Sequence, residues 1–106
     1  FEEIIYSRYQ ARIRDMKILK VDEGFEQILG YSAEDVERLQ LHVKDIMLDE
    51  DWEDYTKIIY AKMSSRGEAY LGHRLKKKNG EIIYVFCFGR AFQSEEGEMW
   101  RSLLQI

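Results

Sequence analysis

The chain has 106 residues, 45% hydrophobic and 34% charged, which is typical of one folded domain and not of a disordered segment. The formal net charge of -4 argues against nucleic-acid binding, because phosphate contacts need clustered Lys and Arg. The single cysteine, Cys87, excludes an internal disulfide and fits a reducing, cytoplasmic compartment. No apolar run reaches the ~20 residues of a membrane-spanning helix, so we expect no direct membrane insertion.

The N-terminal part predicts a helical cap followed by a hairpin. Residues 1–7 place apolar side chains beside two glutamates, which favours an amphipathic helix in front of a domain at residues 8–106. Arg8 to Ile13 and Met16 to Val21 alternate polar and apolar residues on either side of a polar turn. These two segments therefore predict the first two strands.

Two short helices are predicted next. The first starts at Asp22 and ends at Gly30, because glycine accepts the left-handed conformation that follows a helix. Ser32 and Asp35 have the spacing of a capping box, in which each side chain accepts a hydrogen bond from an unpaired amide of the first turn. This pair predicts a second helix that runs toward Leu39.

The longest predicted helix follows an acidic segment. Trp52, Ile59 and Met63 recur at helical spacing, and Asp49 or Asp51 is suited to be the N-cap. The helix is expected to end at Gly67.

The last third changes to strand-like alternation. Three strands are predicted, at Ala69 to Lys77, Glu81 to Phe92 and Met99 to Ile106. Two strands, a series of helices and three further strands give an α+β fold, a five-stranded antiparallel sheet with short helices packed on one face.

The turn at Lys78-Asn79-Gly80 decides which side chains of the following hairpin point inward. A three-residue loop sets Leu71, His73 and Leu75 opposite Cys87, Val85 and Ile83, respectively. A two-residue loop pairs Leu75 with Tyr84 instead. The first register is favoured because it makes one face of the pair consistently apolar.

Several segments resemble PAS domains, and their order and spacing carry the resemblance over nearly the whole chain. They are Val21 to Phe25, Leu29 to Asp35, Leu48 to Asp51, Arg74 to Gly80, the aromatic Tyr84, and Gln105-Ile106. The chain departs from the family pattern at Asp22, where asparagine is usual, and at Leu48-Asp49, which replaces His-Pro.

The resemblance implies a sensory or regulatory domain that is not itself an enzyme. Members of the family hold a ligand, or nothing, between the sheet and its helices. The expected function is dimerisation and relay of a ligand or partner signal through Ile106 to a covalently linked effector, a histidine kinase or a cyclic-dinucleotide cyclase or phosphodiesterase. The alternative is a purely structural dimerisation module with no ligand. A small α+β enzyme is disfavoured because no catalytic residues stand out.

The cofactor is not identified by the sequence. Haem of the usual type is not expected, because residues 50–66 contain no histidine to serve as axial ligand. A cysteinyl flavin is not expected either. Light-sensing members of the family that the chain resembles carry a reactive cysteine near the start of the long helix, whereas Cys87 lies on the penultimate strand. No metal site is expected, because His42 and His73 lack ligand partners at a recognised spacing.

Two sets of residues are the candidates for function. Inward-facing residues form the ligand-pocket candidates, with His73 and Cys87 as the groups that would meet a polar ligand: Phe25, Ile46, Ile59, Met63, His73, Leu75, Val85 and Cys87. The penultimate strand is also apolar on its other side, which requires cover from the N-terminal cap or from a second subunit. The candidates for this surface are Ile4, Ile5, Ile82, Tyr84, Phe86 and Phe88.

Overall fold

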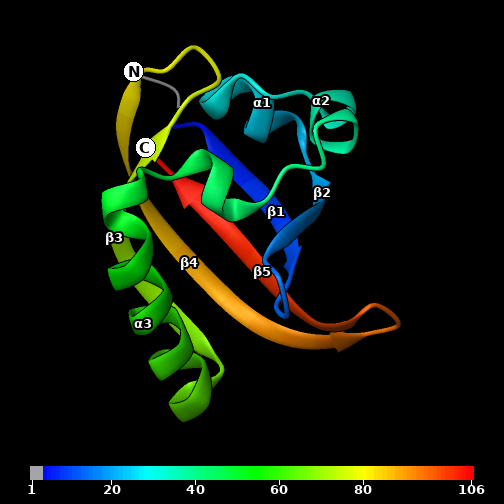
Figure 1. Cartoon of the computed structure of the whole chain (residues 1–106), viewed down its shortest axis with the longest axis vertical. Coiled ribbons are helices and arrows are strands. Elements are labelled where there is room, and N and C mark those ends of the chain that lie inside the picture. The colour runs from blue at the N-terminus through cyan, green and yellow to red at the C-terminus, as the bar shows by residue number, and fades with distance from the viewer. Residues whose placement is uncertain (1–3) are drawn as a thin grey trace.

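The computed structural model describes residues 4–106 and contains a five-stranded antiparallel sheet in the order β2-β1-β5-β4-β3 (Figure 1). The strands are β1 Tyr6–Arg12, β2 Lys17–Val21, β3 Glu68–Lys76, β4 Ile82–Ser94 and β5 Gly97–Gln105. The helices are α1 Glu23–Leu29, α2 Ala33–Arg38, the 3-10 helix η1 Val43–Ile46 and α3 Asp49–Arg66. Helices α1 and α2 pack near β1 and β2, whereas α3 runs along β3, so all lie over the same side of the sheet (Figure 1). The predicted fold class is confirmed.

The predicted helix at residues 1–7 is wrong where the structure describes it. Tyr6 and Ser7 belong to β1, and Ile4 and Ile5 are in neither helix nor strand, while residues 1–3 lie outside the described range. Tyr6 pairs with Gln105 of β5, a partner distant in sequence that local periodicity does not reveal. The two ends of the sheet-forming chain are therefore adjacent.

The ends of the two short helices follow the predicted capping chemistry. Asp22 caps α1 by accepting a hydrogen bond from the amide of Phe25, and Gly30 ends this helix with a φ of 84°. The Ser32 hydroxyl accepts from the amide of Asp35 at 3.0 Å, and the Asp35 carboxylate accepts from the amide of Ser32 at 3.1 Å. The capping box is thus confirmed.

The N-cap predicted for α3 is wrong. Leu48 occupies the N-cap position without a side-chain hydrogen bond, and Asp49 is the first residue of the helix. The carboxylate of Asp51 instead accepts two hydrogen bonds from the Arg74 guanidinium, at 2.8 and 3.0 Å. Asp51, one of the two suggested N-caps, therefore forms an ion pair between α3 and β3. The end of the helix at Gly67, with a φ of 72°, is as predicted.

The β3–β4 hairpin adopts the favoured register. Leu71, His73 and Leu75 pair with Cys87, Val85 and Ile83, and Arg74 pairs with Tyr84. Gly80 has a φ of 89°, and its amide donates to the carbonyl of Lys77, which closes the three-residue loop. The two-residue alternative is excluded.

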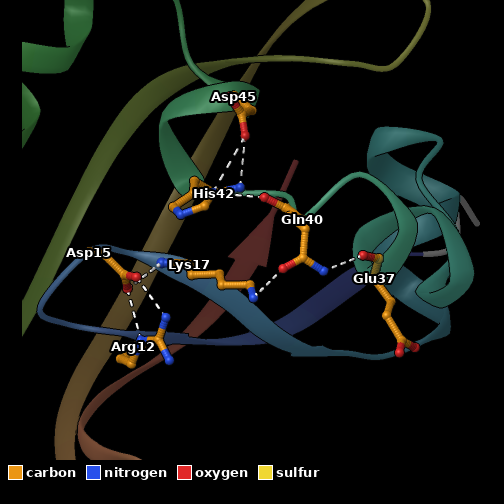
Figure 2. A network of polar contacts seen from close by, with 7 residues as sticks. All are labelled: Arg12, Asp15, Lys17, Glu37, Gln40, His42 and Asp45. Atoms are coloured by element: carbon orange, nitrogen blue, oxygen red, sulfur yellow. Dashed lines mark hydrogen bonds and ion pairs between the residues drawn. The ribbon is translucent and has the colours of Figure 1, made fainter.

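A polar network fastens the loop before η1 to the first hairpin (Figure 2). His42 forms an isolated bridge with Lys17, and its Nδ1 lies 2.8 Å from the Gln40 carbonyl oxygen. The Lys17 ammonium donates to the Gln40 side chain, whereas the Lys17 amide donates to Asp15. His42 therefore connects this loop to the first hairpin, which is a structural role.

The core lies between the inner face of the sheet and the helices, and close approaches fix its shape. A Cβ at Gly24 would lie 1.8 Å from the Tyr6 carbonyl oxygen, so α1 can rest on β1 only with glycine there. A Cβ at Gly89 would lie 1.9 Å from the Trp100 indole, so this ring covers β4. Within residues 4–106, none of the helices is long and apolar enough to cross a membrane.

Candidate functional site

Most of the proposed pocket residues are packed in the core. Phe25, Ile46, Ile59, Leu75, Val85 and Cys87 belong to one hydrophobic cluster, and none of them is more than 1% exposed. The remaining two, Met63 and His73, are partly buried at the edge of this cluster. The fold therefore brings six of the candidates together beneath the helices.

Polar side chains are embedded in this apolar interior. Ser7 of β1 and Ser102 of β5 are fully buried, and the Ser102 hydroxyl lies 2.9 Å from the Cys87 sulfur. Burial raises the pKa of the Cys87 thiol to about 11. The thiol is therefore protonated at neutral pH and acts as a hydrogen-bonding group, not as a nucleophile.

Two buried tyrosines extend the polar group toward α3. Tyr9 of β1 packs edge-on against Phe25 with ring centroids 5.9 Å apart, and Tyr55 lies on α3. Burial raises the pKa of both phenols, so both stay neutral. The Ser7 hydroxyl and the Trp100 indole N–H have no hydrogen-bond partner in the described part of the chain. An unpaired buried polar group has a free-energy cost, which a hydrogen-bonding partner would remove.

His73 lies beside the buried Tyr55, at the edge of this interior. Its ring packs against Tyr55 at a centroid distance of 5.1 Å, and its Nδ1 lies 3.3 Å from the Arg74 carbonyl oxygen. A carbonyl can only accept, so Nδ1 carries the proton and Nε2 is the acceptor. Burial lowers the pKa of His73, which favours this neutral form. The buried Nε2 has no partner among residues 4–106 and suits a hydrogen-bond donor.

His73 also borders a hollow of about 330 Å³ between α3 and the edge strand β3. Apolar and aromatic side chains dominate its wall, among them Tyr55, Ile58, Leu71 and Tyr84. The Arg74–Asp51 ion pair lies at its rim, where the guanidinium lowers the pKa of the Asp51 carboxyl. His73 is therefore part of the wall of this hollow.

Met63 lies away from the other candidates. It borders a separate hollow of about 410 Å³, together with Ile13, Tyr60, Ala91 and Phe92. This hollow is between the C-terminal half of α3 and the ends of strands β4 and β5. Met63 and His73 therefore do not line one common cavity.

The proposed outer row is exposed in the single chain. Ile82, Tyr84, Phe86 and Phe88 are between 43% and 56% exposed, and Tyr84 and Phe86 pack edge to face at 5.8 Å. We call these four residues the aromatic row. Ile4 and Ile5, which were expected to cover it, are themselves 60% and 37% exposed. The described N-terminal residues thus leave the row open.

Metal-ligand geometry is absent from residues 4–106, in which no three His, Cys, Asp or Glu residues form a group able to hold an ion.

A family model described as PAS fold matches residues 18–103. The chain belongs to the PAS family. No curated protein sequence matches it.

Solved structures of other PAS domains have the same fold. A PAS domain from Colwellia psychrerythraea superimposes with a TM-score of 0.83 at 17% identity, covering 96% of this chain and 86% of the other. The PAS domain of a two-component sensor histidine kinase gives 0.77 at 14% identity, with coverages of 96% and 86%. The PAS domain of a LuxR-family transcriptional regulator from Burkholderia thailandensis, in complex with ethanol, gives 0.79 at 14% identity, with coverages of 95% and 88%.

The structure of this PAS domain joins two segments on which the sequence resemblance depends. Arg74, from the hairpin segment, pairs with Asp51, from the acidic segment before α3, at 2.8 Å. The chain shares the PAS fold with a domain of a sensor histidine kinase and with a domain of a LuxR-family transcriptional regulator.

One outer-face aromatic residue of the PAS domain was missed by sequence reasoning. Tyr70 of β3 is 66% exposed and packs against Phe88 at 6.5 Å, so it widens the aromatic row onto the neighbouring strand. Its signal was the alternation in β3, because Leu71 and His73 point inward and the residue before them must point outward.

Proposed function

We propose that this PAS domain forms a homodimer through the aromatic row and relays a ligand or partner signal to a covalently linked effector. The effector is a histidine kinase or an enzyme of cyclic-dinucleotide turnover, and the domain itself carries out no catalytic step. The exposure of the aromatic row is the observation that carries this proposal. A cytoplasmic, reducing location is consistent with the free, buried thiol of Cys87.

The free energy of association would come from burial of the aromatic row. Complete burial of one large apolar side chain contributes ~1.5–3 kcal/mol, and each member of the row still exposes about half of its surface in the single chain. In each subunit, the four side chains of the row and Tyr70 form a contiguous apolar patch. An exposed apolar patch of this kind favours a protein partner. A second copy of the same face is the partner that supplies equally apolar surface.

The position of β5 provides a physical route for the relay. Ser102 of β5 contacts the buried Cys87, while the next residue, Leu103, pairs with Phe88 of the aromatic row. A change on either face of the sheet would therefore reach β5. This strand ends at Gln105, beside Tyr6 of β1. A signal would leave the domain at this end.

A small ligand with a polar tip would bind beside His73. His73 Nε2, the Ser7 hydroxyl and the Trp100 N–H are buried and unpaired among residues 4–106, and His73 is the one of these three that lines a hollow, between α3 and β3. Mass spectrometry of the natively purified protein and an absorbance scan test for a retained ligand. An apo mass and a featureless visible spectrum would favour the alternative, a dimerisation module without a ligand.

Sedimentation of Phe86→Asp beside the parent chain tests the dimer. The buried charge should dissociate it, because a desolvated and unpaired carboxylate is costly. Tyr60→Asp is the matched control, since Tyr60 is an aromatic residue with the same 46% exposure on α3. We expect monomers for Phe86→Asp and dimers for the parent and the control. Equal masses for all three would refute this interface.

A further inference from the structure

A row of long polar side chains crosses the outer face of the sheet next to the aromatic row. Successive cross-strand pairs connect one residue from each of the five strands. In order from β2 to β3 they are Lys20, Gln10, Arg101, Arg90 and Glu68. Arg8, two residues before Gln10 on β1, lies on the same face. We call Arg8, Arg90 and Arg101 the arginine cluster.

The arginine cluster breaks the usual pairing rule of antiparallel sheets. Arg90 and Arg101 lie directly opposite each other, and like charges in this position destabilise the strand pair. Glu68 offsets Arg90 only in part, with an N–O distance of 3.4 Å and both side chains solvent-exposed. The side chains of Arg8 and Arg101 form no ion pair with any carboxylate of residues 4–106. Violations of local rules of this kind are most frequent at functional sites.

The three arginines surround a hollow with an apolar floor. The hollow has a volume of about 190 Å³, and Phe88, Leu103 and Ser102 complete its lining. Phe88 pairs with Leu103, and Leu103 pairs with Arg8, so the floor lies between β4 and β1. Arg101 is held over the ring of Phe92 at 5.0 Å, which fixes one guanidinium at the border.

We propose that the arginine cluster is a binding site for a small organic anion, a carboxylate or phosphate group carried on an apolar body. The anion would neutralise the repulsion between Arg90 and Arg101, and planar guanidinium groups match both oxyanions with paired hydrogen bonds. The apolar body would lie on Phe88 and Leu103. The hollow of about 190 Å³ offers space for the body of a single-ring acid.

This site does not depend on the proposed homodimer. The hollow shares Phe88 with the aromatic row, but the charged contacts are made by the three arginines, which lie outside the row. Anion binding should therefore persist in Phe86→Asp. A parent protein that is monomeric and still binds the anion refutes only the proposed interface, whereas a Phe86→Asp monomer that binds no anion refutes only the anion site.

Titration of the isotope-labelled protein with benzoate, followed by amide resonances at constant low ionic strength, is the test. Benzyl alcohol supplies the same body without charge, acetate supplies the charge without the ring, and phenyl phosphate distinguishes phosphate from carboxylate recognition. We expect saturable shifts at Phe88, Arg90, Arg101 and Leu103 with benzoate or phenyl phosphate, and weaker binding of the other two compounds.

Charge-neutral variants locate the site. Arg101→Gln and Arg8→Gln should each weaken binding of the charged probe about tenfold, the loss expected for one charged hydrogen bond. Arg14→Gln is the control, because Arg14 is an exposed arginine in the β1–β2 turn. Equal binding of benzyl alcohol and benzoate would overturn the proposal. An equal loss in Arg14→Gln, or shifts confined to other surfaces, would do the same.

Discussion

The two faces of β4 are both apolar, but they lie in opposite environments. Val85 and Cys87 are fully buried beneath the helices, while Tyr84, Phe86 and Phe88 alternate with them and are about half exposed. An apolar strand normally requires cover on both sides. The inner face therefore stabilises the fold, whereas the outer face is available for association.

Truncation on the inner face should be the most damaging change. Leu75 is 1% exposed and is part of the core cluster, so Leu75→Ala should lower the free energy of unfolding by ~2–5 kcal/mol. Phe86→Ala on the outer face should cost the monomer less than ~1 kcal/mol, since its surface is already half hydrated. Urea unfolding at low protein concentration measures both. Similar losses at the two positions would contradict the division between the faces.

Adding a methyl group in place of a glycine hydrogen should also destabilise the protein more on the inner face than on the outer face. A Cβ at Gly89 would collide with the fully buried Trp100 indole, whereas a Cβ at Gly72 would meet the ring tip of the exposed Tyr84, with its nearest atom at 2.4 Å. Tyr84 can move into solvent, but Trp100 cannot. Gly89→Ala should therefore cost ~1–3 kcal/mol, and Gly72→Ala distinctly less, in thermal or urea unfolding. If Gly72→Ala were the more costly substitution, the packing described here would be wrong.

Acid should lower the stability of the fold through ion pairs in the helical layer and in the β1–β2 hairpin. Hydrogen bonds from Lys78 lower the pKa of Asp35, those from Arg74 lower that of Asp51, and those from Arg12 lower that of Asp15 to about 2. A lowered folded-state pKa contributes stability above the unfolded value of 3.8, which is lost as the pH falls through the folded value. Stability should therefore fall modestly between about pH 4 and pH 2.

Asp35→Asn provides the comparison for the acid experiment. The Asp35 carboxylate accepts from Lys78 and so connects α2 to the β3–β4 hairpin. Its removal should flatten the acid dependence of the urea midpoint, because one of the depressed carboxyl groups is then missing. An unchanged dependence would show that Asp35 contributes nothing to it.

Local chemistry in the sequence was sufficient for most of the fold. Glycines at helix ends, the Ser32–Asp35 capping box and the alternation of apolar residues act over a few positions, so they can be read without tertiary structure. The register of the β3–β4 hairpin was predictable for the same reason. This register places His73 and Cys87 on the inner side of the sheet.

Tertiary partners explain what the sequence did not reveal. Tyr6 and Ser7 join a strand because β5 offers hydrogen bonds to them, and Asp51 pairs with Arg74 of β3 instead of capping α3. The opposition of Arg90 and Arg101 depends on the register between two strands. In each case the deciding residue lies far along the chain, beyond the range of local patterns.

Intermolecular nuclear Overhauser effects in a mixed sample of labelled and unlabelled protein test the central claim directly. The account predicts contacts between the rings of Tyr84, Phe86 and Phe88 of one protomer and outer-face side chains of its partner. Dimers whose intermolecular contacts arise only from the helical side, with the aromatic row still in contact with water, would contradict it.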